Sequence, residues 1–163
     1  MCIRDSPQVI YASPLKRAAE TAQIIAGRVG LTVQFDEDLM EWNNGVLAGM
    51  LLSEAAARYP YPEGGRKPHE SVPGGETDIA FRARAESVWA KIFYQTGDDQ
   101  RVALVAHGGI IAQLFQCFLK LPMQPNIWLV TGDTGMHLWK TKGTTRWVVF
   151  SNRLEHVREV STP

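Results

Sequence analysis

The segment that most constrains the fold runs from Val102 to Ile111 and reads Val-Ala-Leu-Val-Ala-His-Gly-Gly-Ile-Ile. Its first residues are apolar or small, as in a buried strand, and apolar residues recur at helical spacing after the two glycines. The pattern predicts a strand, a tight glycine turn and a helix, with His107 at the carboxyl end of the strand. Ligands bind at this end of the strands in open α/β sheets, and helix N-termini favour anions.

Strand-like and helix-like patterns alternate through the rest of the chain. Ser13 and Pro14 predict a helix start, because serine is a good N-cap and proline suits the first helical position. A long helix begins near Thr77, with Arg82, Arg84 and Glu86 away from its apolar face. The expected strands are 8–12, 32–35, 102–105, 134–139 and 146–151. The first helix is expected to turn five side chains inward: Leu15, Ala18, Ala19, Ala22 and Ile25. A short helix capped by Ser53 is expected to run through Tyr59.

This order of elements predicts a three-layer α/β/α fold, with a mostly parallel sheet and helices on both faces. Residues 7–160 form a single domain in this interpretation, and the first strand and helix of such a sheet are missing ahead of Gln8. Residues 60–76 are rich in proline and glycine, and we interpret this long irregular stretch as a flap over a site.

Residues 1–6 read Met-Cys-Ile-Arg-Asp-Ser and resemble the translation of a transposon-end adaptor used in DNA library preparation. We therefore expect a non-native leader, with the natural protein extending upstream of Pro7; the alternative is a short disordered tail. The 163 residues carry a net charge of zero, which gives no indication of nucleic-acid or membrane binding. Two cysteines are too few for a disulfide scaffold, so a cytoplasmic protein is the default expectation.

Four residues attract attention as candidates for chemistry. Arg17 lies in the first turn of a helix that follows a strand, Glu41 lies in a glycine-bounded loop, Glu76 precedes a capped helix, and His107 ends a strand. Each also has an ordinary structural interpretation: a solvated arginine, an exposed loop acid, a negative charge at a helix N-terminus, and a hydrogen-bonded turn histidine.

Other uses of the His-Gly-Gly triplet do not fit. A lipase or esterase oxyanion hole requires a Gly-x-Ser-x-Gly nucleophile turn, and a dinucleotide site requires Gly-x-Gly-x-x-Gly after the strand; the chain contains neither in the required place. The four histidines are scattered, and no pair has the helical spacing of metal ligands. We therefore expect no metal site and no cofactor.

The set of motifs, taken in order, resembles the histidine phosphatase superfamily, also called phosphoglycerate mutase-like. The resemblance rests on Tyr11–Ala22, on Glu41 with its glycines, on Pro73-Gly74-Gly75-Glu76, on Val105–Gly109, and on Asn152 with His156. It implies catalytic roles for Arg17, Glu41 and His107, and phosphate binding by Arg17, His107 and the Gly108 N–H. Glu41 would transfer a proton to the leaving oxygen, and no metal would be needed.

The resemblance implies a phosphomonoester hydrolase of a small phosphorylated metabolite that works through a phosphohistidine intermediate. The family's nucleophile belongs to an Arg-His-Gly motif, which does not occur in this sequence. We therefore expect the chain to be an N-terminally truncated, inactive fragment of an active parent enzyme. Phosphoglycerate mutase-type phosphoryl transfer and a non-catalytic phosphate-binding protein remain as alternatives.

Overall fold

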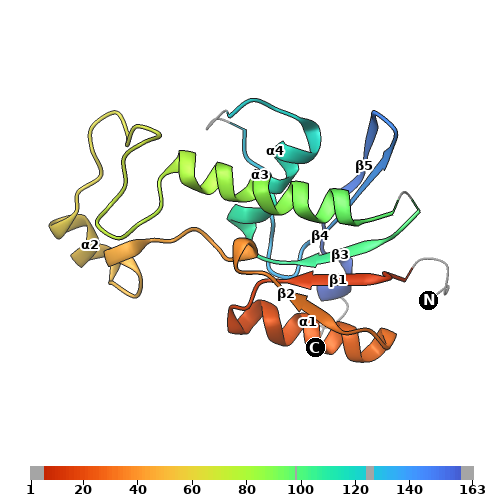
Figure 1. The fold of residues 1–163 in the computed structure, drawn as a ribbon. Coiled ribbons are helices and arrows are strands. Elements are labelled where there is room, and N and C mark those ends of the chain that lie inside the picture. The colour runs from red at the N-terminus through yellow and green to blue at the C-terminus, as the bar shows by residue number, and fades with distance from the viewer. Residues whose placement is uncertain (1–5, 98, 124–126, 159–163) are drawn as a thin grey trace.

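The computed structural model describes residues 6–97, 99–123 and 127–158. A parallel three-stranded sheet has the order β2-β1-β3, built from β1 (Val9–Ala12), β2 (Val33–Phe35) and β3 (Val102–Val105). Helix α1 (Lys16–Val29) covers one face of this sheet, while α3 (Asp78–Gln95) and α4 (Gly108–Leu119) lie over the other (Figure 1). The predicted α/β fold with a parallel sheet and helices on both faces is confirmed.

The central strand β1 shows how the layers are held together. Ile10 and Ala12 pack with Ala22 and Ala26 of α1, whereas Tyr11 packs with the residues of α3 and α4. This alternation follows from the period of two along a strand, which sends successive side chains to opposite faces. One short strand therefore contributes to both halves of the core.

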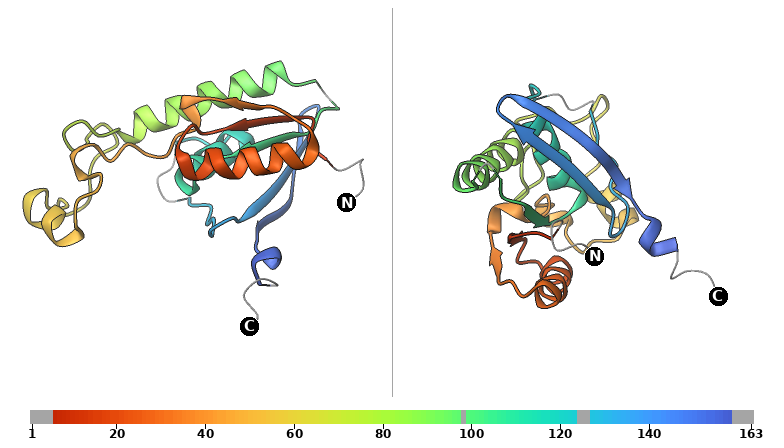
Figure 2. Two further views of the ribbon diagram at one scale, coloured as in Figure 1. Left: turned by 90° about the horizontal axis from the view of Figure 1, so that it is seen from below. Right: turned by 90° about the vertical axis from the view of Figure 1, so that its right-hand side faces the viewer.

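An antiparallel hairpin of β4 (Met136–Lys142) and β5 (Thr145–Arg153) forms a separate sheet. Trp139 anchors it to α4, since its ring centroid lies 5.3 Å from that of Phe115 and 5.3 Å from that of Phe118. Figure 2 shows the hairpin beside α4, on the opposite side of the parallel sheet from α1. The short helix α5 (Glu155–Arg158) follows β5.

The long segment that joins β2 to α3 carries short helices, the last of which lies well beyond the sheet (Figure 1). These are the 3-10 turns η2 (Glu37–Leu39) and η3 (Gly45–Leu47) and the helix α2 (Leu52–Arg58). None of the helices within the described ranges is long and apolar enough to cross a membrane. Of the expected leader, residues 1–5 lie outside the described residues.

Several local predictions were wrong. Ser13 does not cap α1: Leu15 is the N-cap and the helix begins at Lys16. Ile25 is 37% exposed, because Ala18, Ala22 and Ala26 form the buried stripe of α1 instead. Ser53 lies inside α2, whose N-cap is Leu51.

Two further predictions about burial were also wrong. The strand β3 is only half-buried, because β1 is the one described strand that pairs with it. Arg82 is only 8% exposed and lies against α4, where it donates to the Gln116 side chain at 2.8 Å and to the Leu121 carbonyl at 2.8 Å. The Glu86 carboxylate also accepts from the guanidinium, at 3.0 and 2.6 Å, and this ion pair together with the two bonds above is why a charged residue is tolerated there.

Candidate active site

The candidate site lies where β1 and β3 end. His107 is the N-cap residue of α4 and is 6% exposed. Its Nε2 atom lies 2.8 Å from the Ser13 hydroxyl oxygen, which also accepts a hydrogen bond from the Leu15 N–H at 3.2 Å. Because Ser13 directly follows β1, the two strand ends hold the imidazole between them. Our sequence interpretation placed Ser13 only as a helix cap and missed this contact.

Glu41 meets the same helix from a distant loop. Its Oε2 atom accepts a hydrogen bond from the Gly109 N–H at 2.9 Å, and its Oε1 atom accepts one from the Trp42 N–H at 2.9 Å. A carboxylate at this point stabilises the N-terminus of α4 through the helix dipole and by satisfying an otherwise unpaired N–H. Gly109 leaves room for it, because a Cβ atom there would collide with the Glu41 carboxylate.

Arg17 and the Gly108 N–H are the remaining members of the candidate site. Arg17 lies in the first turn of α1, and its positive charge acts on His107. Within the described part of the chain, neither the Arg17 guanidinium nor the Gly108 N–H makes a hydrogen bond or ion pair. The structure therefore brings Arg17, Glu41, His107 and Gly108 to one end of the sheet, with two donors left free for an anion.

A second layer of contacts holds the Glu41 loop. Arg84 donates to both carboxylate oxygens of Glu76, at 3.0 and 2.9 Å, and to the carbonyls of Asp38 at 2.7 Å and Met40 at 2.9 Å. A longer contact of 3.5 Å reaches the Glu41 carbonyl. The Glu76 carboxylate thus pairs with Arg84, in addition to carrying negative charge ahead of α3. Our interpretation had placed Arg84 only among the residues away from the apolar face.

Burial lowers the pKa of His107 below its usual value; the positive charge of Arg17 lowers it further, and Glu41 opposes the shift. Burial also lowers the pKa of His137. Both imidazoles therefore favour the neutral form in the folded protein.

These shifts predict how stability depends on pH. As pH falls below the ordinary histidine pKa of about 6.5, the unfolded chain binds protons that the folded chain does not, so the free energy of unfolding decreases until the folded pKa values are passed. We expect the His107→Asn variant to show a shallower decline in urea melts between about pH 7 and 5. His69→Asn, at an exposed position, is the matched control and should leave the slope unchanged. Equal slopes in wild type and His107→Asn would contradict the burial argument.

The fold and site together define an α/β domain with a cluster of charged and polar residues at the carboxyl ends of its parallel strands. The family model for the histidine phosphatase superfamily (branch 1) matches residues 3–152. The chain belongs to this superfamily.

Several curated relatives are phosphatases by name. Glucosyl-3-phosphoglycerate phosphatase of Mycobacterium tuberculosis is 36% identical over 146 residues, covering 82% of this chain and 63% of the relative. Phosphoserine phosphatase 1 of Hydrogenobacter thermophilus is 36% identical over 107 residues, covering 64% of this chain and 50% of the relative. The chain thus spans less than two thirds of the length of these relatives.

Solved structures agree with the fold. The complex of mycobacterial glucosyl-3-phosphoglycerate phosphatase with inorganic phosphate has a TM-score of 0.61 and 33% identity, covering 74% of this chain and 62% of that one. A Bacillus stearothermophilus protein, YhfR, has a TM-score of 0.68 and 25% identity, covering 90% of this chain and 78% of that one.

Proposed function

We propose that the protein represented by this chain hydrolyses phosphomonoesters of small metabolites in the cytoplasm through a phosphohistidine intermediate. The observation that carries the proposal is the convergence of Arg17, His107 and the unpaired Gly108 N–H at the strand ends. The names of the relatives, and the phosphate bound to one of them, support the same reaction class.

The residues suit distinct parts of this chemistry. The planar fork of Arg17 matches two oxygens of a phosphoryl group, and His107 and the Gly108 N–H donate to the same oxygens. Such donors act by stabilising the charge of the transition state. Glu41 is our candidate for protonating the leaving oxygen and then accepting a proton from the attacking water.

The nucleophilic step needs a histidine that attacks phosphorus, and the family supplies it from an Arg-His-Gly motif that these 163 residues do not contain. We therefore propose that the chain, expressed as it stands, binds phosphate without hydrolysing phosphomonoesters. Phosphate binding and turnover are accordingly tested separately.

The first test is calorimetric titration of the chain with inorganic phosphate. We expect Arg17→Ala and His107→Ala each to weaken binding by about tenfold or more, because each removes a charged or buried donor to the anion. Arg28→Ala, which removes an exposed cation from the last turn of the same helix, is the matched control and should bind like wild type. Phosphate affinity that does not change in Arg17→Ala would refute the proposed site.

The second test is turnover of p-nitrophenyl phosphate by the same preparation, which we expect to be undetectable. Turnover that disappears in His107→Ala would show that the chain is active without the Arg-His-Gly motif. The proposed need for that nucleophile would then be wrong.

A further inference from the structure

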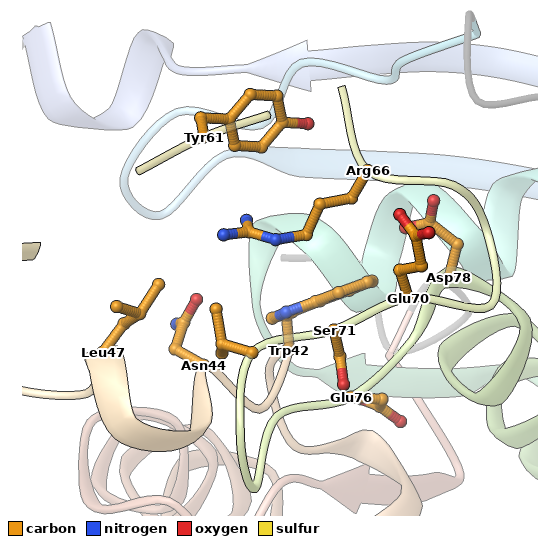
Figure 3. A pocket seen from close by; sticks show the side chains of 10 residues that line it. Trp42, Asn44, Leu47, Tyr61, Arg66, Glu70, Ser71, Glu76 and Asp78 are labelled. Carbon is orange, nitrogen blue, oxygen red and sulfur yellow. The ribbon is translucent and has the colours of Figure 1, made fainter. Parts of the chain in front are cut away.

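A cavity of about 240 Å³ adjoins the Glu41 loop on the side of the long irregular stretch. Trp42 and Asn44, which follow Glu41 in the chain, form one wall, and Tyr61 lies across from them (Figure 3). The Arg66 side chain extends into the space between Tyr61 and Trp42. Trp42 is the immediate chain neighbour of Glu41, and the cavity lining contains none of the proposed phosphate-binding residues.

The cavity presents polar groups that the protein leaves unused. Within the described residues, the side chains of Asn44, Arg66, Ser71 and Asp78 make no hydrogen bond or ion pair with protein; Arg66 contacts only the ring of Tyr61, at 5.0 Å from its centroid. A guanidinium donates, a carboxylate accepts, and an amide and a hydroxyl do both. The free groups therefore form a mixed set of donors and acceptors around one space.

The charges of the lining disfavour a second anionic group on a ligand. Glu70 and Asp78 bring two carboxylates that no arginine or lysine neutralises in the described structure, against the single guanidinium of Arg66. A third lining carboxylate, Glu76, is already balanced by Arg84. A phosphate or carboxylate placed here would meet more negative than positive charge.

Neutral hydroxyl groups fit the same lining better. Each hydroxyl both donates and accepts, so it can pair with Asp78 on one side and with Arg66 or Asn44 on the other. The aromatic faces of Trp42 and Tyr61 provide apolar area for the carbon skeleton between the hydroxyls. Tyr61 is 70% exposed, which places it at the rim and leaves the cavity open to a ligand.

We propose that this cavity binds the hydroxyl-rich part of the substrate, so that the preferred substrates are phosphomonoesters of sugars or polyols. The inference rests on the proposed function, because the phosphoryl end of the same molecule is assigned to Arg17 and His107. Arg66 is the specificity-determining residue, since it is the cation among the lining residues and its guanidinium lies over the Tyr61 ring.

The test compares two ligands with the same six-carbon chain, sorbitol 6-phosphate and hexyl phosphate, by calorimetric titration of the full chain. We expect sorbitol 6-phosphate to bind about tenfold or more tightly, the equivalent of one or two net hydrogen bonds. Arg66→Met should remove most of this preference while leaving inorganic phosphate affinity unchanged. Lys67→Met, which neutralises the neighbouring cation outside the cavity lining, is the matched control and should keep the preference.

The outcomes separate the two proposals. Arg17-dependent phosphate binding without a preference for sorbitol 6-phosphate would refute the cavity inference and leave the proposed function standing. A second outcome is a preference for sorbitol 6-phosphate that depends on Arg66, together with a phosphate affinity that Arg17→Ala does not change. This outcome would refute the proposed phosphate site and support the cavity inference. A preference that persists in Arg66→Met would overturn the role of Arg66. Circular dichroism of each variant checks that its fold is intact.

Discussion

Replacing Arg84 with methionine is expected to lower the free energy of unfolding by about 3 kcal/mol. The side chains of Arg84 and Glu76 are 18% and 12% exposed, and their ion pair is bidentate. Breaking a buried pair by removing one partner is strongly destabilising, because the other charge stays buried and unpaired. The substitution also removes the donor to the carbonyls of Asp38 and Met40, which lose hydrogen bonds within the same loop.

Chemical denaturation measures this effect, and the chain contains a suitable control. Arg58 and Glu54 form an ion pair four residues apart on α2, with side chains 66% and 42% exposed. Exposed helical pairs contribute about 0.3–0.5 kcal/mol, so Arg58→Met should change stability little. Comparable losses in Arg84→Met and Arg58→Met would mean that burial does not set the strength of the Arg84 pair.

The double variant Arg84→Met/Glu76→Gln tests the cause. If the unpaired Glu76 carboxylate produces most of the loss, neutralising it should recover part of the lost stability. If the carbonyls of the Glu41 loop produce it, the double variant should be no more stable than Arg84→Met. Either result identifies the contact that accounts for most of the lost free energy of unfolding.

The sequence predicted the elements around His107 well, because local pattern controls them. The apolar run that ends at His-Gly-Gly produces β3 and α4, and Thr77 caps α3 by accepting from the Ala80 N–H at 3.1 Å. His107, Glu41 and Arg17 were predicted as site residues from their places in the pattern of strands, helices and loops, and their catalytic roles from the ordered resemblance to a family. Their spacing of 24 and 66 residues carries no geometric signal of its own.

The contacts that the sequence did not predict join distant residues. Arg84 and Glu76 are eight residues apart, but Glu76 lies outside the helix, so helical spacing does not relate them. The local pattern at Ser13 predicts only a helix cap, which the structure does not show, and the contact of Ser13 with His107 depends on the pairing of β1 with β3. Tertiary contacts thus change the roles of residues whose local pattern already has a simple interpretation.

Replacing Gly45 with alanine is expected to lower the free energy of unfolding by about 3 kcal/mol. Gly45 has a φ of +51°, and a Cβ atom there would collide with the backbone of residues 73–75. A left-handed conformation costs a non-glycine residue about 1–2 kcal/mol, and forced backbone shifts in a tight contact cost about 1–3 kcal/mol more. The contact also carries the hydrogen bond from the Val46 N–H to the Pro73 carbonyl at 3.1 Å.

Gly49→Ala separates the two contributions. Gly49 has a similar φ of +77° in the same loop, but nothing lies within 4 Å of the position of its Cβ atom. We therefore expect about 1 kcal/mol from Gly49→Ala in urea denaturation, the conformational cost alone. Equal losses at both positions would show that the close approach to residues 73–75 adds nothing. A larger loss at Gly45 would mean that this approach fixes the Glu41 loop against the Pro73–Glu76 segment, since the Asn43 carbonyl accepts from the Glu76 N–H at 2.9 Å just beside it.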